Sequence, residues 1–262
     1  MKISDLKKKI QAFPNNPGIY IFNGQGGRKL YIGKANDLKK RLFSYIRASD
    51  SRIIRMLELA KSIEVRETLS DIDALIFESQ LIKLHRPQFN IMLRDDKQYF
   101  FVGFSKPTAR RDRFPRIILT HQRINKFDLI GPFTDGGSLK NVLGSLKRIF
   151  PYCTCKEKHK RPCVRSEIGR CLVICCLKNP PEKDPREKIY KRNIRAIKNI
   201  LRGRKQDVIK RLEREMNRYS KAQNFEKAKE ARDRLWALEN IFRHAPIVKR
   251  ELNPEHLKAL VL

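Results

Sequence analysis

The chain has 262 residues and a formal net charge of +31, with 59 lysines and arginines against 28 acidic residues. This charge predicts a polyanionic partner, although composition alone fits a ribosomal or architectural DNA protein equally well. No run of roughly 18 apolar residues and no secretory signal is recognisable, which argues against a membrane span and predicts a cytoplasmic location. The length predicts one mixed domain of about 100 residues plus smaller modules.

Two short tyrosine motifs near the start predict a β-hairpin. Gly18-Ile19-Tyr20 and Tyr31-Ile32-Gly33 lie in alternating sequence, and Gln25-Gly26-Gly27 between them tolerates positive φ. The hairpin places the phenols of Tyr20 and Tyr31 side by side. Simple cross-strand aromatic packing, which stabilises hairpins by about 0.2 to 1 kcal/mol, is the alternative explanation for the pair.

A helix over residues 38–45 is predicted next, with Asn36 or Asp37 as its N-cap. Arg41 and Tyr45 are four residues apart and therefore lie on one face of this helix. Lys34 precedes the cap. Cations are thus expected beside the hairpin phenols.

A second helix is predicted from Ser70 to about Leu84, and it carries Glu78 within its apolar stripe. A carboxylate in such a position requires a cation, so Glu78 is either a metal ligand or the partner of Lys34 or Arg41 in a salt bridge. Pro87 ends the helix, and Asn90 is expected to begin an extended segment. Phenols, cations, a carboxylate and an amide are together suited to phosphodiester hydrolysis.

The middle of the chain predicts further strands and a cysteine centre. Residues 99–104 and 116–119 are expected to be strands, and Gly131-Pro132-Phe133 to form a turn before a helix over residues 138–149. All six cysteines lie between positions 153 and 176, which favours a metal centre over scattered disulfides. Spacing does not separate zinc from an iron-sulfur cluster, and reduced structural thiols are the alternative. The four-thiolate set is Cys155, Cys163, Cys171 and Cys175, with His159 available and Cys153 and Cys176 as extra thiols.

The last part of the chain predicts a helical hairpin with a break at Gln223-Asn224. Apolar residues recur at steps of three and four on both sides of the break, as in a narrow coiled-coil seam. From pattern alone, the hairpin can pair with itself or with a partner.

Residues 14–98 resemble the GIY-YIG nuclease domain, and more narrowly the N-terminal nuclease domain of the UvrC family. The matching motifs are Pro17-Gly18-Ile19-Tyr20, Tyr31-Ile32-Gly33-Lys34-Ala35, Asp37-Leu38-Lys39-Lys40-Arg41-Leu42, Glu78, Leu81-Ile82-Lys83, Asn90 and Leu93-Arg94-Asp95-Asp96-Lys97. This resemblance implies a catalytic set of Tyr20, Tyr31, Lys34, Arg41, Tyr45 and Glu78, supported by Asn90.

The predicted chemistry uses one divalent ion, Mg²⁺ or Mn²⁺, at Glu78. Lys34 and Arg41 are expected to offset charge on the phosphate oxygens. Tyr31 is the favoured general base because Lys34 is three residues away, while Tyr20 remains open in that role.

The resemblance extends beyond the nuclease. Phe150-Pro151, Arg161-Pro162-Cys163 and Gly169-Arg170-Cys171 match the UvrC pattern and imply a 4Fe-4S cluster, with Zn²⁺ as the alternative. Leu172-Val173-Ile174-Cys175 departs from it by lacking the usual Gly-Pro, which weakens the choice of ligands. Residues 225–235 resemble the UVR motif, which implies docking of a UvrB-like protein.

The predicted fold class is α+β: a small GIY-YIG domain with a short antiparallel sheet and helices, followed by a Cys-rich module and an α-helical hairpin. The predicted divisions are a nuclease domain (1–98), a linking α/β extension that carries DNA or docks the Cys-rich module (99–150), a Cys-rich metal-binding module (151–180), a helical linker (181–204), a UVR hairpin (205–243) and a C-terminal tail (244–262).

The resemblance implies a 3′-side incision in double-stranded DNA that carries a lesion, in nucleotide excision repair. The RNase H-like and helix-hairpin-helix half of the family does not lie within these residues, so the 5′-side incision is not assigned to them. The alternatives are a non-catalytic repair-associated DNA-binding adaptor and a GIY-YIG nuclease of branched or mobile-element DNA.

Overall fold

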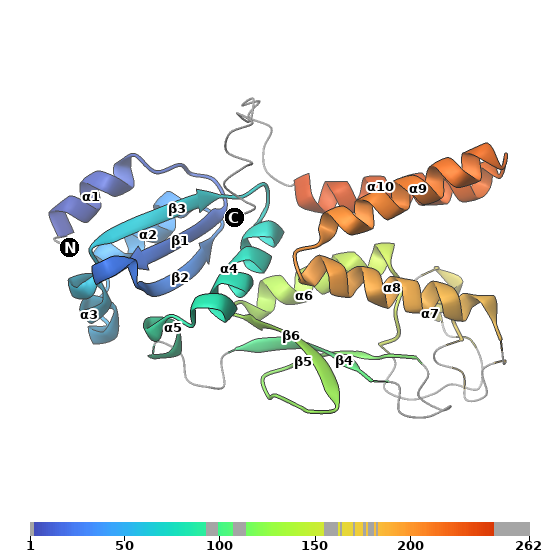
Figure 1. Ribbon diagram of the computed structural model, residues 1–262, viewed down its shortest axis with the longest axis horizontal. Helices are drawn as coiled ribbons and strands as arrows, with labels where there is room; N and C mark the ends of the chain where they lie inside the picture. Colours follow the sequence, from blue (N-terminus) through green and yellow to red (C-terminus); the bar gives the residue numbers. More distant parts are fainter. Residues whose placement is uncertain are drawn as a thin grey trace.

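The computed structural model describes residues 3–92, 99–106, 114–154 and 183–243, together with 162, 164–169, 171–174, 177 and 181. Two antiparallel sheets lie on either side of helix α4 (Asp71–His85), as Figure 1 shows. The sheet within residues 18–67 belongs to what is here called the first half of the molecule, and the sheet within residues 100–133 belongs to the second half, from which a helical hairpin extends. The elements are α1 (Ile3–Gln11), β1 (Gly18–Asn23), η1 (Gln25–Gly27), β2 (Lys29–Ala35), α2 (Leu38–Ile46), α3 (Ser51–Leu59), β3 (Ser62–Glu67), α4 (Asp71–His85), α5 (Gln88–Met92), β4 (Phe100–Ser105), β5 (Ile117–Thr120), β6 (Phe127–Phe133), α6 (Gly136–Ile149), α7 (Val164–Glu167), α8 (Pro185–Leu201), α9 (Lys205–Lys221) and α10 (Phe225–Arg243). This mixed α and β architecture confirms the predicted fold class.

The first sheet has the order β2-β1-β3, so the predicted hairpin is present and a third strand pairs with its other side. Gly26 and Gly27 take φ values of 64° and 76° in the connection, which glycine adopts without strain. In the register of the hairpin, Tyr20 lies opposite Gly33 and Phe22 lies opposite Tyr31. The two motif tyrosines therefore share one face of the sheet.

Helix α4 joins the two halves of the molecule. Its N-cap is Ser70, as predicted, whose side chain accepts a hydrogen bond from the backbone of Asp73. Ile82 packs with isoleucines of the first sheet, whereas Leu75 and Ile76 pack in the core of the second half. The sequence predicted a single apolar stripe, but a helix that lies between two cores buries more than one face.

Asn90 does not begin an extended segment, because Pro87 is followed at once by the short helix α5. Proline is well suited to the first turn of a helix, so it ends α4 and opens α5 in the same place. Asn90 is fully buried, and its amide bonds both backbone groups of Ile32: Nδ2 donates to the carbonyl at 2.7 Å and Oδ1 accepts from the N–H at 2.8 Å. Asn90 thereby satisfies the hydrogen-bonding groups of the Ile32 backbone at the outer edge of β2.

The second sheet has the order β5-β4-β6, and the expected turn at Gly131-Pro132-Phe133 is instead the end of strand β6. Proline has no N–H for a ladder hydrogen bond and is tolerated in an edge strand, which β6 is. Helix α6 then starts at Gly136, with Asp135 as its N-cap, two residues earlier than predicted.

Helices α8, α9 and α10 complete the second core. Tyr190 of α8 is fully buried and donates to the carbonyl of Pro115 at 2.7 Å. The predicted helical hairpin is present, with its break at Gln223, and Leu212 and Leu238 bury its inner side against the same core. Among the described residues, no helix is long and apolar enough to cross a membrane.

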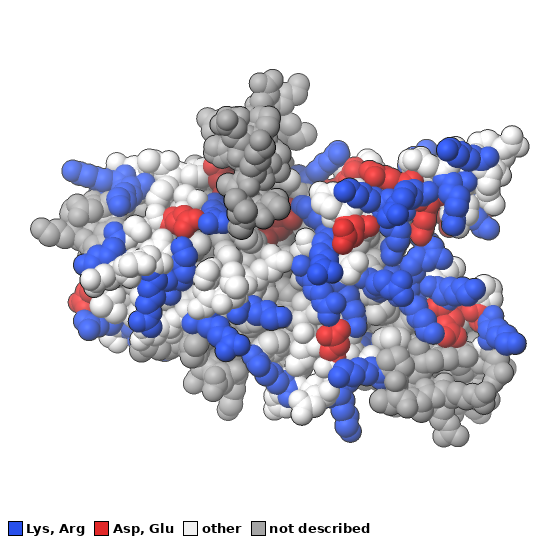
Figure 2. All heavy atoms as spheres, in the orientation of Figure 1, with Lys and Arg blue, Asp and Glu red and all other residues white. Residues whose placement is uncertain are grey.

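Of the predicted thiolate ligands, only Cys171 is described, and it is buried, as is the extra thiol Cys153. Cys155, Cys163, Cys175, Cys176 and His159 lie outside the described residues. Lysine and arginine side chains are spread over both halves of the face shown in Figure 2 rather than gathered on one element.

Candidate active site

Three tyrosines meet on one face of the first sheet. Tyr20 of β1, Tyr31 of β2 and Tyr45 of α2 are 0%, 6% and 4% exposed. The ring centroid of Tyr20 lies 6.0 Å from that of Tyr31 and 5.8 Å from that of Tyr45. A Cβ at Gly33 would collide with the Tyr20 phenol, so the glycine of the second motif makes room for the tyrosine of the first.

The Tyr20 hydroxyl is held by two neighbours. It shares a hydrogen bond of 2.8 Å with the Tyr45 hydroxyl and accepts one of 3.1 Å from Arg41 Nε. Burial raises the pKa of Tyr20 well above its ordinary value, and the nearby phenols add to this effect more than Arg41 opposes it. Burial likewise raises the pKa of Tyr45. Both phenols therefore keep their protons at neutral pH.

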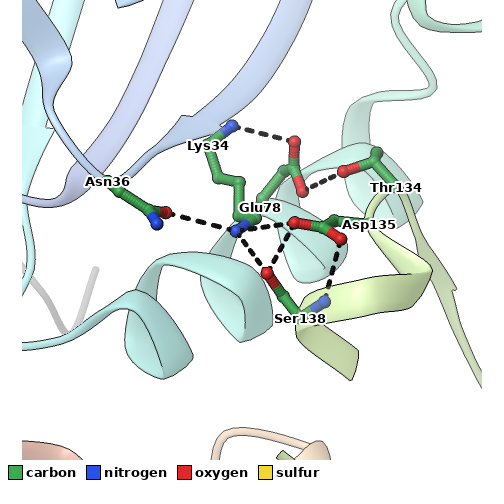
Figure 3. Close-up of polar contacts among 6 residues, drawn as sticks. All are labelled: Lys34, Asn36, Glu78, Thr134, Asp135 and Ser138. Atoms are coloured by element: carbon green, nitrogen blue, oxygen red, sulfur yellow. Dashed lines mark hydrogen bonds and ion pairs between the residues drawn. The ribbon is translucent and has the colours of Figure 1, made fainter. Parts of the chain in front are cut away.

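Glu78 is 2% exposed, and each of its carboxylate oxygens accepts a hydrogen bond from a neutral group (Figure 3). The backbone N–H of Lys34 donates to Oε1 at 2.9 Å, and the Thr134 hydroxyl donates to Oε2 at 2.6 Å. The contact with Lys34 is thus made by the backbone and not by the ammonium that a salt bridge requires. These two donors fix the plane of the carboxylate.

The Lys34 ammonium is bound by residues of the second half of the molecule, near the start of α6. Its side chain is 9% exposed, and Nζ lies 3.0 Å from Asp135 Oδ2 and 2.9 Å from Ser138 Oγ. A longer contact of 3.4 Å reaches Asn36. Partial burial disfavours ionisation of Asp135, but hydrogen bonds from Ser138 and the Lys34 ammonium outweigh it and lower the pKa of Asp135 to about 2.

These groups surround one pocket of about 460 Å³. Two of the predicted site residues do not line this pocket. Tyr45 is hydrogen-bonded to the Tyr20 hydroxyl, and Asn90 is hydrogen-bonded to the backbone of β2. Thr134, Asp135 and Gly136 form a wall that sequence reasoning did not identify. The pocket is lined by Tyr20, Tyr31, Gly33, Lys34, Ala35, Asn36, Arg41, Glu78, Thr134, Asp135 and Gly136.

The donor set fits a hard divalent cation. A carboxylate at the wall of a polar pocket is the type of ligand that Mg²⁺ takes, with water and substrate oxygens filling its remaining positions. Hydrogen bonds to the ligating carboxylate are also typical of such sites, and Lys34 N and Thr134 Oγ1 supply them here. Among the described residues, no group of three or more His, Cys, Asp or Glu is arranged to hold a metal ion.

Three family matches follow one another along the chain. The UvrC-like GIY-YIG domain matches residues 16–91, the middle domain of UvrC/Cho excinuclease matches 105–199, and the UvrB/uvrC motif matches 206–241. The chain belongs to the UvrC family. The predicted resemblance is thereby confirmed for the nuclease domain and for the UVR hairpin.

Longer relatives agree with this assignment. UvrABC system protein C of Methanospirillum hungatei is 35% identical over 253 residues, covering 95% of this chain and 46% of that protein. The protein of the same name from Dictyoglomus thermophilum is 34% identical over 252 residues, covering 94% and 40%. The chain thus spans less than half the length of these UvrC relatives.

Solved structures of the isolated nuclease domain are also similar in sequence. The GIY-YIG N-terminal endonuclease domain of UvrC from Thermotoga maritima, bound to its catalytic divalent cation magnesium, is 38% identical. The match covers 35% of this chain and 100% of the Thermotoga maritima domain, with a TM-score of 0.33.

Proposed function

We propose that this chain is a divalent-metal-dependent DNA endonuclease that makes the 3′-side incision in nucleotide excision repair. The observation that carries the proposal is the pocket, which is lined by the Glu78 carboxylate, two phenols and two cationic side chains. Membership of the UvrC family supports the same activity. The net charge of +31 supports DNA as the substrate, because phosphate neutralisation supplies affinity without sequence preference.

The residues of the pocket take distinct roles in this proposal. Glu78 would hold Mg²⁺ or Mn²⁺, and the bound ion would supply Lewis-acid stabilisation of charge at the scissile phosphate. Lys34 and Arg41 offset charge on the nonbridging oxygens. Tyr31, as general base, accepts the proton of the attacking water while the new P–O bond forms and the bond to the 3′ oxygen breaks, and the released 3′ oxygen takes up a proton from water. Tyr20 and Tyr45 orient Arg41 through the hydrogen bonds among them.

A lesion-containing duplex, labelled at one end, tests the substrate and the side of incision together. We expect one cut on the 3′ side of the lesion that requires Mg²⁺ and a UvrB-like partner. Cleavage without the partner would instead favour a nuclease of branched or mobile-element DNA. DNA binding with no cleavage under any condition would favour the non-catalytic adaptor.

The UVR hairpin supports docking of the UvrB-like partner. Phe225 and Trp236 on α10 are 69% and 65% exposed, which is high for large apolar side chains. These rings supply the type of apolar area that anchors a protein interface. Such a partner and a DNA substrate support a cytoplasmic location for the proposed activity.

We also propose that the cysteine cluster holds a metal centre, a 4Fe-4S cluster in preference to Zn²⁺. The support is the confinement of all six cysteines to residues 153–176 and the UvrC-type flanking motifs. Anaerobically purified protein is expected to be brown and to contain about four irons and four sulfides per chain. Zinc without iron would establish the alternative, and the absence of both metals would leave reduced thiols.

A further inference from the structure

The contact between the two halves of the molecule reaches the charged groups of the candidate active site. Thr134, Asp135 and Ser138, here called the β6–α6 corner, belong to the second half. Thr134 binds the carboxylate of Glu78, and the other two bind the ammonium of Lys34 (Figure 3). We propose that Asp135 is a positioning residue of the nuclease, which holds the Lys34 ammonium in the pocket. This inference rests on the proposed function.

Lys34 needs such a support because of its chemistry. A lysine side chain is flexible and carries three N–H donors, so an unrestrained ammonium does not occupy one place. Here three acceptors surround Nζ: Ser138 Oγ at 2.9 Å, Asp135 Oδ2 at 3.0 Å and Asn36 Oδ1 at 3.4 Å. A phosphate oxygen can replace the long contact to Asn36 while Asp135 and Ser138 keep the ammonium in position.

The position of Asp135 is itself fixed. It is the N-cap of α6, and its Oδ1 accepts a hydrogen bond of 2.9 Å from the backbone N–H of Ser138. Helix α6 is anchored by Leu139 and Leu146 in the same core as Leu75 of α4, the helix that carries Glu78. Packing between α4, α6 and β6 therefore sets the spacing between the ammonium and the carboxylate.

Charge balance supports the same role. The Lys34 side chain is 9% exposed, and an ammonium so far removed from water requires a carboxylate to compensate its lost hydration. Asp135, which lines the same pocket, supplies this carboxylate. Among the contacts of the Lys34 ammonium that the structure describes, residues of the first half of the molecule supply no carboxylate.

The substitution Asp135→Asn removes the charge and keeps the fold. Asparagine caps helices about as well as aspartate, so the start of α6 is preserved. The comparison set is Lys34→Met, the double variant, Ser138→Ala, and Asp50→Asn as a matched control, since Asp50 caps α3 outside the pocket. Each variant of the 262-residue chain is assayed with saturating Mg²⁺, lesion duplex and partner, after thermal unfolding has confirmed its fold.

We expect Asp135→Asn to lower kcat about 10-fold, because misplacement of a catalytic group by about 1 Å can cost about 100-fold and a loosely held ammonium is misplaced for only part of the time. KM for DNA is expected to change less than about 2-fold. Lys34→Met is expected to lower kcat about 100-fold, and the double variant to equal Lys34→Met. Equal kcat values for the double variant and Lys34→Met would show that Asp135 acts through Lys34. An unchanged kcat in Asp135→Asn, or losses that multiply in the double variant, would overturn the inference.

A second measurement does not depend on cleavage. Amine-reactive labelling, read out by peptide mass spectrometry, reports how tightly the Lys34 ammonium is held. We expect labelling of Lys34 to be severalfold faster in Asp135→Asn than in the wild type or in Asp50→Asn. Equal labelling overturns the inference. If the wild type cleaves no DNA, the proposed function fails while the labelling result still decides whether Asp135 holds Lys34.

Discussion

Glu78→Gln is expected to lower Mg²⁺-dependent cleavage by at least about 10³-fold, because a neutral amide does not replace a carboxylate as the protein ligand of a hard divalent ion. The fold is expected to persist, since glutamine has the same shape. Its Oε1 can accept from the backbone N–H of Lys34, and its Nε2 can donate to the Thr134 hydroxyl, which rotates to accept. The hydrogen bonds with Lys34 and Thr134 are thereby retained.

Three measurements isolate this effect: single-turnover cleavage across a series of Mg²⁺ and Mn²⁺ concentrations, DNA affinity, and the midpoint of thermal unfolding. Affinity and midpoint should stay near those of the wild type. Glu58→Gln is the matched control, because Glu58 is an exposed carboxylate of α3 that pairs with Arg55 and does not line the pocket. Full activity of Glu78→Gln would exclude the metal role of Glu78.

Local patterns in the sequence are sufficient to predict the helices and strands that carry the nuclease motifs. The caps at Asp37 and Ser70 and the break at Gln223 follow from side-chain chemistry within three or four residues, and the structure confirms them. The alternation around the two tyrosine motifs likewise predicts their shared face. Family resemblance then supplied the grouping of residues from β1, β2, α2 and α4, which spacing alone does not give.

Features set by packing over long distances in the chain were not predictable in this way. Ser138 of the β6–α6 corner contacts Lys34 across 104 residues of sequence, and the packing of α4 against both cores brings the two together. Asp135 and Ser138 look like an ordinary helix cap in the sequence, which they also are. The placement of Pro132 in a strand depends on β6 being an edge strand, which no local signal reveals.

The structure also changes the basis for choosing between the two phenols. Tyr31 was favoured for its spacing from Lys34, but the Lys34 ammonium pairs with Asp135. Tyr20 is the poorer base, because its hydroxyl is hydrogen-bonded to Tyr45 and Arg41 and burial raises its pKa. A base that must first lose a tightly held proton is poor at neutral pH. Tyr31 also lines the pocket, with a side chain that is 6% exposed, and it remains our candidate for the base.

Tyr31→Phe is therefore expected to slow hydrolysis by about 10² to 10³-fold with DNA affinity unchanged, since a general base contributes this order of rate. Tyr20→Phe is expected to have a smaller effect, because it removes one acceptor of the Arg41 guanidinium and leaves the base in place. Tyr45→Phe is the matched comparison, as it deletes a hydroxyl of the same cluster that does not line the pocket. Single-turnover rates at saturating enzyme separate chemistry from binding. A larger loss in Tyr20→Phe than in Tyr31→Phe, at equal DNA affinity, would transfer the role of base to Tyr20 and would require Arg41 to stabilise its phenolate.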